Sequence, residues 1–342
     1  MKPERLLWAN NLRATATVAV IMLHVASTIS SLYPGIPKSY LLTSIFFDSA
    51  VRWSVPVFIM LSGSFALENY DDKLGNFFVK MFYRIILPFL FWSVVYLFYF
   101  SWDELTDPGK STIQLLAFIG KQFLEGTATH LWFVYIIISM YLTFPFLSKW
   151  TKVATEKEYI YFFVLWIFFL LVDPFLSSYD INFTYTYFTG FIGYIVLGNY
   201  LFKSKRRYSN LLLISLLLSA FFYTAIRTYF ISLNENKDEE FFMDNLSLNI
   251  FVMSFCVYSI FKNNAYFTNS FLQKAVGIVC QYSYGIYLSH ILVLYLFLWI
   301  GIPFYYIHPA LSILLTTLGC LIVSCGLVYV LKKIPYLRAV AG

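Results

Sequence analysis

Charged side chains are scarce in this sequence. Asp, Glu, Lys and Arg make up 12% of its 342 residues, whereas soluble proteins carry about 25%. Hydrophobic residues make up 60%, and the mean hydropathy is +0.70. This composition excludes a soluble globular protein, because apolar runs extend from one end of the chain to the other. It predicts an integral membrane protein, with one transmembrane domain over residues 1–342 and no soluble domain.

Several chemical signatures are also missing. The sequence has no glycine-rich phosphate loop, no metal-ligand spacing and no defensible Ser-His-Asp order. We therefore expect no bound metal ion. The net charge of +6 is better explained by basic residues on one side of a membrane than by a nucleic-acid partner. The few cysteines lie in or beside apolar runs and are interpreted as small buried hydrophobic residues: Cys256, Cys280, Cys320 and Cys325.

What the sequence does contain is a series of long apolar runs. A helix needs about 20 apolar residues to cross a bilayer, and runs near that length indicate about ten spans. The predicted fold class is therefore an all-α, polytopic membrane helix bundle. The weakest runs are the fifth, which ends at Asp173–Pro174, and the eighth, which opens with polar residues. The runs are 11–32, 46–68, 82–101, 131–150, 158–175, 184–202, 210–232, 245–262, 278–300 and 309–332.

The loop charges predict the orientation of these spans. Cytoplasmic loops are enriched in lysine and arginine, and here both residues gather in alternate loops and at both ends of the chain. Every loop agrees with an even number of spans and with both termini in the cytoplasm. The N-terminal run, preceded by Lys2 and Arg5, is interpreted as an uncleaved first span. The outer loops carry mainly acidic residues: Asp103, Glu104, Asp107, Asp173, Asp180, Glu235, Asp238, Glu239 and Glu240.

Arg13 and His24 stand out in the first run. On a helix they fall on nearly the same face, roughly 16 Å apart along the axis at ~1.5 Å per residue. An ionisable stripe is costly in lipid unless it faces protein or water. One interpretation is structural, with Arg13 reaching the interface and His24 making one interhelical hydrogen bond. The other is functional, with His24 as the best candidate for a general base.

The second run holds a further pair of charges. Asp48 and Arg52 are i,i+4 neighbours that can pair on one helix face, either as a structural ion pair or as part of a site on the outer half. Pro56 removes one backbone hydrogen bond and is expected to kink the span. Ser62–Gly63, near its inner end, favours a close approach of another helix.

Lys80 and Arg84 precede Pro88 where the third run leaves the cytoplasm. They are either ordinary cytoplasmic-side charges or, with Arg13 at the same membrane level, a cationic entry for an anionic cytosolic ligand.

Three other ionisable residues are substrate-side candidates. His130 opens the fourth run at the outer surface, and His290 lies roughly halfway across the ninth; each could instead be a satisfied polar residue. Arg227, in the outer half of the seventh run, either lines a polar cavity or extends outwards. His308 is assigned no role. Residues 111–124 have helical amphipathic spacing, which predicts a short helix in the outer interface, either as a lid or as packing.

Several segments of the sequence resemble the membrane-bound acyltransferase 3 family. They are the Arg-ten residues-His spacing of the first run, SVPVFIMLSG in the second, RIILPFLFWS in the third, HLWFVYIIISMYLTFPF in the fourth and YSYGIYLSH in the ninth. The similarity extends from residue 5 to about residue 300, with the motifs in family order. It is strongest to the short, membrane-only branch that O-acetylates surface polysaccharides, including the enterobacterial common antigen acetyltransferase and the Ica-type biofilm protein.

This resemblance implies a function. Members transfer an acyl group, usually acetyl, from cytosolic acyl-CoA to a sugar hydroxyl at or beyond the outer face, which implies a bacterial cytoplasmic membrane. Arg13 and His24 correspond to the family pair, with His24 essential. The usual Arg-x-Arg pair before the third span is here KMFYR, which leaves Lys80 and Arg84 as the contacts to the CoA phosphates, at a different spacing.

The expected partners are the bilayer, acetyl-CoA or another short acyl-CoA, a polysaccharide or lipid-linked sugar, and polysaccharide synthase machinery. A polysaccharide exporter or flippase is the alternative, since about ten spans with charge at mid-depth suit either class. The small number of deep ionisable residues and the absence of an evident repeat favour the enzyme. A non-catalytic partner of a polysaccharide synthase remains a third reading.

Overall fold

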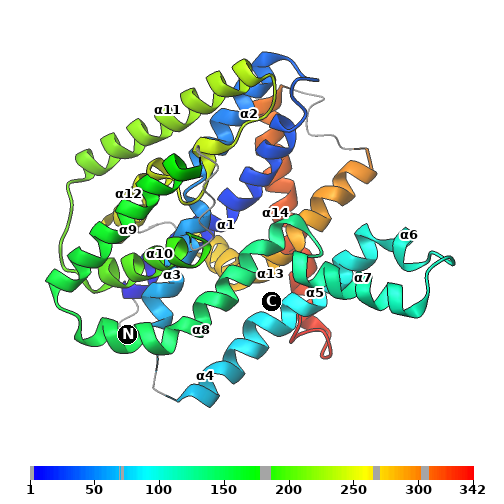
Figure 1. Cartoon of the computed structure of the whole chain (residues 1–342), viewed down its shortest axis with the longest axis horizontal. Coiled ribbons are helices and arrows are strands. Elements are labelled where there is room, and N and C mark those ends of the chain that lie inside the picture. The colour runs from blue at the N-terminus through cyan, green and yellow to red at the C-terminus, as the bar shows by residue number, and fades with distance from the viewer. Residues whose placement is uncertain (1–3, 69, 71–72, 178–185, 265–269, 302–307) are drawn as a thin grey trace.

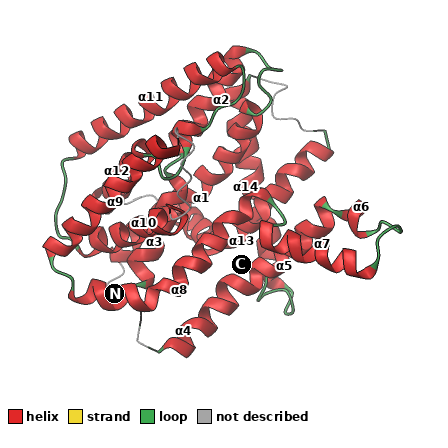
Figure 2. Cartoon of the chain, viewed as in Figure 1, coloured by secondary structure: helices red, strands yellow, loops and turns green. Residues whose placement is uncertain are grey.

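The computed structural model describes residues 4–68, 70, 73–177, 186–264, 270–301 and 308–342. Every regular element within these residues is a helix (Figures 1 and 2), which confirms the all-α prediction. The long helices are α1 (Glu4–Ser30), α2 (Lys38–Val51), α3 (Ser54–Ala66), α4 (Leu74–Met81), α5 (Leu87–Phe100), α7 (Thr112–Glu125), α8 (Trp132–Val153), α9 (Glu156–Ser177), α10 (Thr186–Lys203), α11 (Asn210–Glu235), α12 (Leu248–Asn264), α13 (Ser270–Trp299) and α14 (Pro309–Lys333). The short ones are α6 (Trp102–Leu105), η1 (Phe82–Ile86), η2 (Thr129–Leu131) and η3 (Phe241–Met243).

Each predicted apolar run corresponds to one helix or to two consecutive ones. Eight segments of the described chain are long and apolar enough to cross a membrane, which supports a polytopic bundle. Helices α9 and α10 cover the other two runs. The start of run 184–202 and the charges Lys2 and Asp180 lie outside the described residues. A total of ten spans and the cytoplasmic location of both termini stay predictions.

Helix α1 lies between two hydrophobic cores. Leu12 and Ala16 pack into a core with α3, α10 and α12, whereas Ile21 and Val25 pack into a second core with α5, α13 and α14. Figure 1 shows α1 in the middle of the bundle. A helix that is apolar on several faces is expected to be buried in this way. Polar groups on α1 are therefore held at fixed positions inside the protein.

The predicted kink in the second span is confirmed. Its helix ends at Val51 and restarts at Ser54, so that Arg52 and Trp53 form a turn between α2 and α3. Pro56 lies in the first turn of α3, and its ring nitrogen cannot donate to the Arg52 carbonyl as a regular helix would require. The first amide to bond back across the break is that of Val57, to the Trp53 carbonyl at 3.1 Å.

The third span contains a π-helical turn, η1, between α4 and α5. Pro88 follows it, and because proline lacks an N–H, the carbonyl four residues earlier, that of Arg84, loses its regular donor. The Leu87 N–H bonds to the Phe82 carbonyl five residues back. Such π-turns within α-helices occur frequently at functional sites, and this one carries Arg84.

The close helix approach predicted at Ser62–Gly63 is also present. A Cβ on Gly63 would lie 2.1 Å from the Ile195 carbonyl oxygen of α10, and one on Gly198 would lie 2.0 Å from the Met60 carbonyl oxygen of α3. Small residues allow backbones to approach in this way. The Ser64 hydroxyl is 3.0 Å from the Gly198 carbonyl oxygen and 2.7 Å from the Tyr258 hydroxyl.

The helix predicted at 111–124 is α7, which begins with a capping box made by Ser111 and Gln114. Figure 1 shows α6 and α7 projecting from the side of the bundle beside α5. Ile113 and Leu116 are exposed, whereas Ile119 is half-buried. The amphipathic helix is thus confirmed, while its place in the membrane interface stays a prediction.

Candidate active site

A cavity of about 720 Å³ opens on the side of the bundle predicted to be cytoplasmic; we call it the inner cavity. Four basic side chains line it: Arg13 of α1, Arg84 of η1, Lys332 of α14, and Arg338 beyond α14. Its described lining residues include no Asp or Glu. Much of the remaining wall is apolar or aromatic, as with Phe58. Such a cavity suits a ligand with an anionic head and a long uncharged arm.

The structure brings together two of the three cations of the predicted entry. Arg13 and Arg84 line the same cavity, although they are 71 positions apart in the sequence. Lys80 is exposed on α4 and is absent from the cavity wall. Lys332 and Arg338 take part instead. The sequence marked both only as cytoplasmic-side charges, and nothing in its spacing indicated that they approach Arg13.

A second cavity of about 300 Å³ lies on the opposite side; we call it the outer cavity. His24, Arg52 and His130 line it, together with Glu240 and Asn245 from the segment between α11 and α12. Trp132 also lines it and is 39% exposed. Polar donors and acceptors beside an aromatic ring suit a hydroxyl-rich ligand.

Three predicted histidines come together beside the outer cavity. The ring centroids of His24 and His290 are 5.1 Å apart, those of His130 and His290 are 5.2 Å apart, and those of His24 and His130 are 6.4 Å apart. His130 and His290 are buried. Among the described residues, no group of three or more His, Cys, Asp or Glu side chains is arranged to hold a metal ion.

Hydrogen bonds from Tyr96 and Tyr287 tie together the backbone segments that carry His130 and His290. Nδ1 of His290 lies 2.6 Å from the Tyr287 carbonyl oxygen, and the Tyr287 hydroxyl donates to the His130 carbonyl oxygen. The Tyr96 hydroxyl donates to the Leu288 carbonyl at 2.8 Å, and its ring lies 5.1 Å from that of His130. Nε2 of His290 has no hydrogen-bond partner among the described residues.

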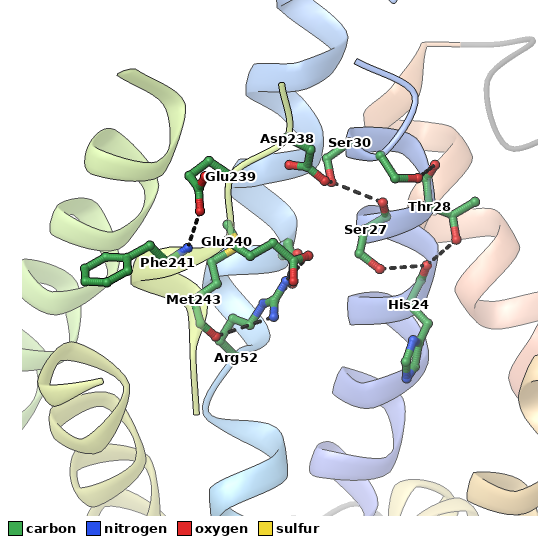
Figure 3. A network of polar contacts seen from close by, with 12 residues as sticks. His24, Ser27, Thr28, Ser30, Arg52, Asp238, Glu239, Glu240, Phe241 and Met243 are labelled. Carbon is green, nitrogen blue, oxygen red and sulfur yellow. Dashed lines mark hydrogen bonds and ion pairs between the residues drawn. The ribbon is translucent and has the colours of Figure 1, made fainter. Parts of the chain in front are cut away.

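The predicted Asp48–Arg52 ion pair forms, and Arg52 also contacts Glu240 and Met243. Nε and Nη2 of Arg52 donate to Oδ1 and Oδ2 of Asp48 at 2.7 and 2.5 Å, and Nη2 also donates to Glu240 Oε1 at 3.0 Å. Nη1 reaches the Met243 carbonyl at 3.4 Å. Figure 3 shows Arg52 directed at the segment that carries Glu240 and Met243, with His24 on the neighbouring helix.

The same acidic segment is tied to the end of α1. The Ser30 hydroxyl donates to Asp238 Oδ2 at 2.8 Å, and Figure 3 shows the two side chains next to each other. Burial raises the pKa of the Asp238 carboxyl, whereas the hydrogen bond from Ser30 opposes that rise. This segment therefore links α1 to Arg52 along one side of the outer cavity.

The candidate Arg227 lies elsewhere, as does His308, which was assigned no role. Arg227 is exposed on α11, where its guanidinium lies 5.3 Å from the centroid of the Phe242 ring. It is absent from the walls of both the inner and the outer cavity, so it follows the outward-extending alternative. His308 caps α14, with Nδ1 accepting from the Ala310 N–H at 3.3 Å.

The two cavities are separated by a pair of aromatic rings. Phe133 of α8 and Tyr287 of α13 are the two residues that line both cavities, and their ring centroids are 5.5 Å apart. Arg13 and His24, which were expected on one helix face, therefore line different cavities on either side of this pair. This pair could not be singled out from the sequence, because 21% of all residues are aromatic.

A family model described as an acyltransferase domain matches residues 6–330, nearly the whole chain. No curated protein and no solved structure matches. The matched region contains both cavities except for the last residues of the inner cavity wall, which include Arg338.

Proposed function

This chain belongs to the membrane-bound acyltransferase 3 family, and we propose that it transfers an acetyl group from cytosolic acetyl-CoA to a sugar hydroxyl of a surface polysaccharide or glycolipid. The observation that supports this most directly is the pair of cavities that meet at Phe133 and Tyr287. One cavity carries cations on the predicted cytoplasmic side, and the other carries His24. An acyltransferase that joins substrates from opposite sides of a membrane needs such an arrangement.

The inner cavity is the proposed donor site. Coenzyme A carries phosphates, which charge-assisted hydrogen bonds from Arg13, Arg84, Lys332 and Arg338 would hold. Its pantetheine arm would extend along the apolar wall that includes Phe58 and Ile137. The thioester would then lie near the aromatic pair, at the end of the inner cavity that faces His24.

The outer cavity is the proposed acceptor site. We propose that a ring nitrogen of His24 takes the proton of the acceptor hydroxyl as its oxygen attacks the thioester carbonyl. The C–O bond of the ester forms, the C–S bond breaks, and the proton passes to the leaving CoA thiolate. General-base catalysis of this kind contributes about 10²–10⁴-fold. His290 and His130, packed beside His24, are proposed to hold its ring in position.

The experiment uses membranes that contain the protein, acetyl-CoA labelled in the acetyl group, and polysaccharide from a strain lacking the gene. We expect label in the polymer, released by mild alkali as an O-ester, and none with empty membranes. In the deletion strain we expect normal export of unacetylated polymer. Polymer trapped inside the cells, with no label transferred in the membrane assay, would instead support the exporter alternative.

A further inference from the structure

Only two of the described residues form the wall between the inner and the outer cavity. Phe133 and Tyr287 border both spaces, with their rings at 64° to one another. Any group that moves from the inner cavity to His24 must pass these rings or displace one of them. The space between these two rings therefore limits the size of the group that can be transferred.

The two rings differ in how firmly they are held. Tyr287 is 9% exposed, and its hydroxyl donates to the His130 carbonyl while its own carbonyl faces His290 Nδ1 at 2.6 Å. The side chain of Phe133 has no polar atom and is half-buried. Its ring contacts are looser, at 6.1 Å to Trp132 and 6.5 Å to Phe58 between centroids. Tyr287 therefore forms a fixed side of the wall, and Phe133 forms its adjustable side.

Helix α8 leads from the inner cavity to this wall. Phe133, Ile137 and Tyr141 follow one another at four-residue spacing and all line the inner cavity, because residues i and i+4 lie on one helix face. An uncharged arm lying along this stripe would end at Phe133. The acyl group at the end of that arm would then contact the Phe133 ring directly.

We propose that Phe133, packed against the fixed ring of Tyr287, determines the length of the acyl group, so that acetyl is accepted and longer chains are rejected. This inference rests on the proposed acyl transfer. A close-fitting apolar pocket changes kcat/KM by about 10- to 200-fold for each added or missing methylene. Discrimination between acetyl and butyryl is therefore expected to be at least about 10-fold.

The test compares acetyl-CoA with butyryl-CoA as donors for the wild type and for Phe133→Ala. We expect the acetyl-to-butyryl ratio of kcat/KM to fall at least about 10-fold in the variant, through faster butyryl transfer. Phe163→Ala is the matched control, because Phe163 is also half-buried but packs on α10 away from both cavities. Its ratio should equal that of the wild type. Phe133→Trp should raise the ratio.

Binding of unacylated CoA gives a readout apart from catalysis. Measurable CoA binding by Phe133→Ala shows that the variant is folded, and the control Phe163→Ala, away from both cavities, should bind CoA with the wild-type Kd. A wild type that transfers acetyl, combined with an unchanged ratio in both Phe133 variants, would overturn the role of Phe133 alone. A wild type that transfers no acyl group from either donor would overturn the proposed function together with it.

Discussion

Replacing Asp48 by Asn is expected to destabilise the protein strongly. The Asp48 side chain is 1% exposed and that of Arg52 is 9% exposed, so the substitution leaves a buried guanidinium without its main partner. Breaking a buried pair on one side costs about 3–5 kcal/mol. Glu240 remains 3.0 Å from Arg52 and offsets part of this cost, so the expected loss is about 3 kcal/mol.

Glu240→Gln provides the matched comparison. The Glu240 side chain is 52% exposed, and exposed ion pairs contribute about 0.2–1 kcal/mol. Both variants are measured by denaturant-induced unfolding in detergent micelles, followed by tryptophan fluorescence. The reasoning would be refuted by Asp48→Asn costing no more than Glu240→Gln.

A double substitution then separates stability from function. Replacing a whole buried ion pair by apolar residues of similar size is often neutral for stability, so Asp48→Leu with Arg52→Met should unfold near the wild-type denaturant concentration. We nevertheless expect it to lose acetyl transfer, because Arg52 lines the outer cavity. Full transfer by this variant would mean that the pair is purely structural.

Two further changes follow from the packing and from the inner cavity. Gly198→Ala places a Cβ 2.0 Å from the Met60 carbonyl oxygen and should lower the free energy of unfolding by about 1–3 kcal/mol in the same assay. Gly326→Ala, with nothing within 4 Å of its Cβ, should leave that free energy unchanged. Equal results for the two variants would contradict the close approach of α3 and α10. Arg84→Ala should raise the KM for acetyl-CoA about tenfold or more, which corresponds to a loss of about 1.4 kcal/mol of phosphate binding. Lys80→Ala should leave this KM unchanged, because Lys80 is absent from the cavity wall. An equal effect of the two substitutions would argue against the inner cavity as the donor site.

The sequence predicted the helices well because membrane spans are long apolar runs with few competing signals. The break at Arg52–Trp53 and the π-turn at Phe82–Ile86 both follow from a proline whose missing N–H acts on nearby residues. The Asp48–Arg52 pair could be predicted for a similar reason, since i,i+4 contacts depend only on the helix itself.

The site was harder to predict because it depends on contacts between distant segments. His24, His130 and His290 were each identified singly, but their approach to within 5.1–6.4 Å is a property of the packed bundle. Lys332 and Arg338 looked like ordinary cytoplasmic-side charges until the end of the chain was placed beside Arg13.

The most direct test is acetyl transfer by His24→Ala in membranes that contain as much protein as the wild type. We expect the rate to fall by about 10²-fold or more, with CoA binding unchanged, because His24 lines only the outer of the two cavities. Wild-type transfer by this variant would contradict the role of His24 as the general base.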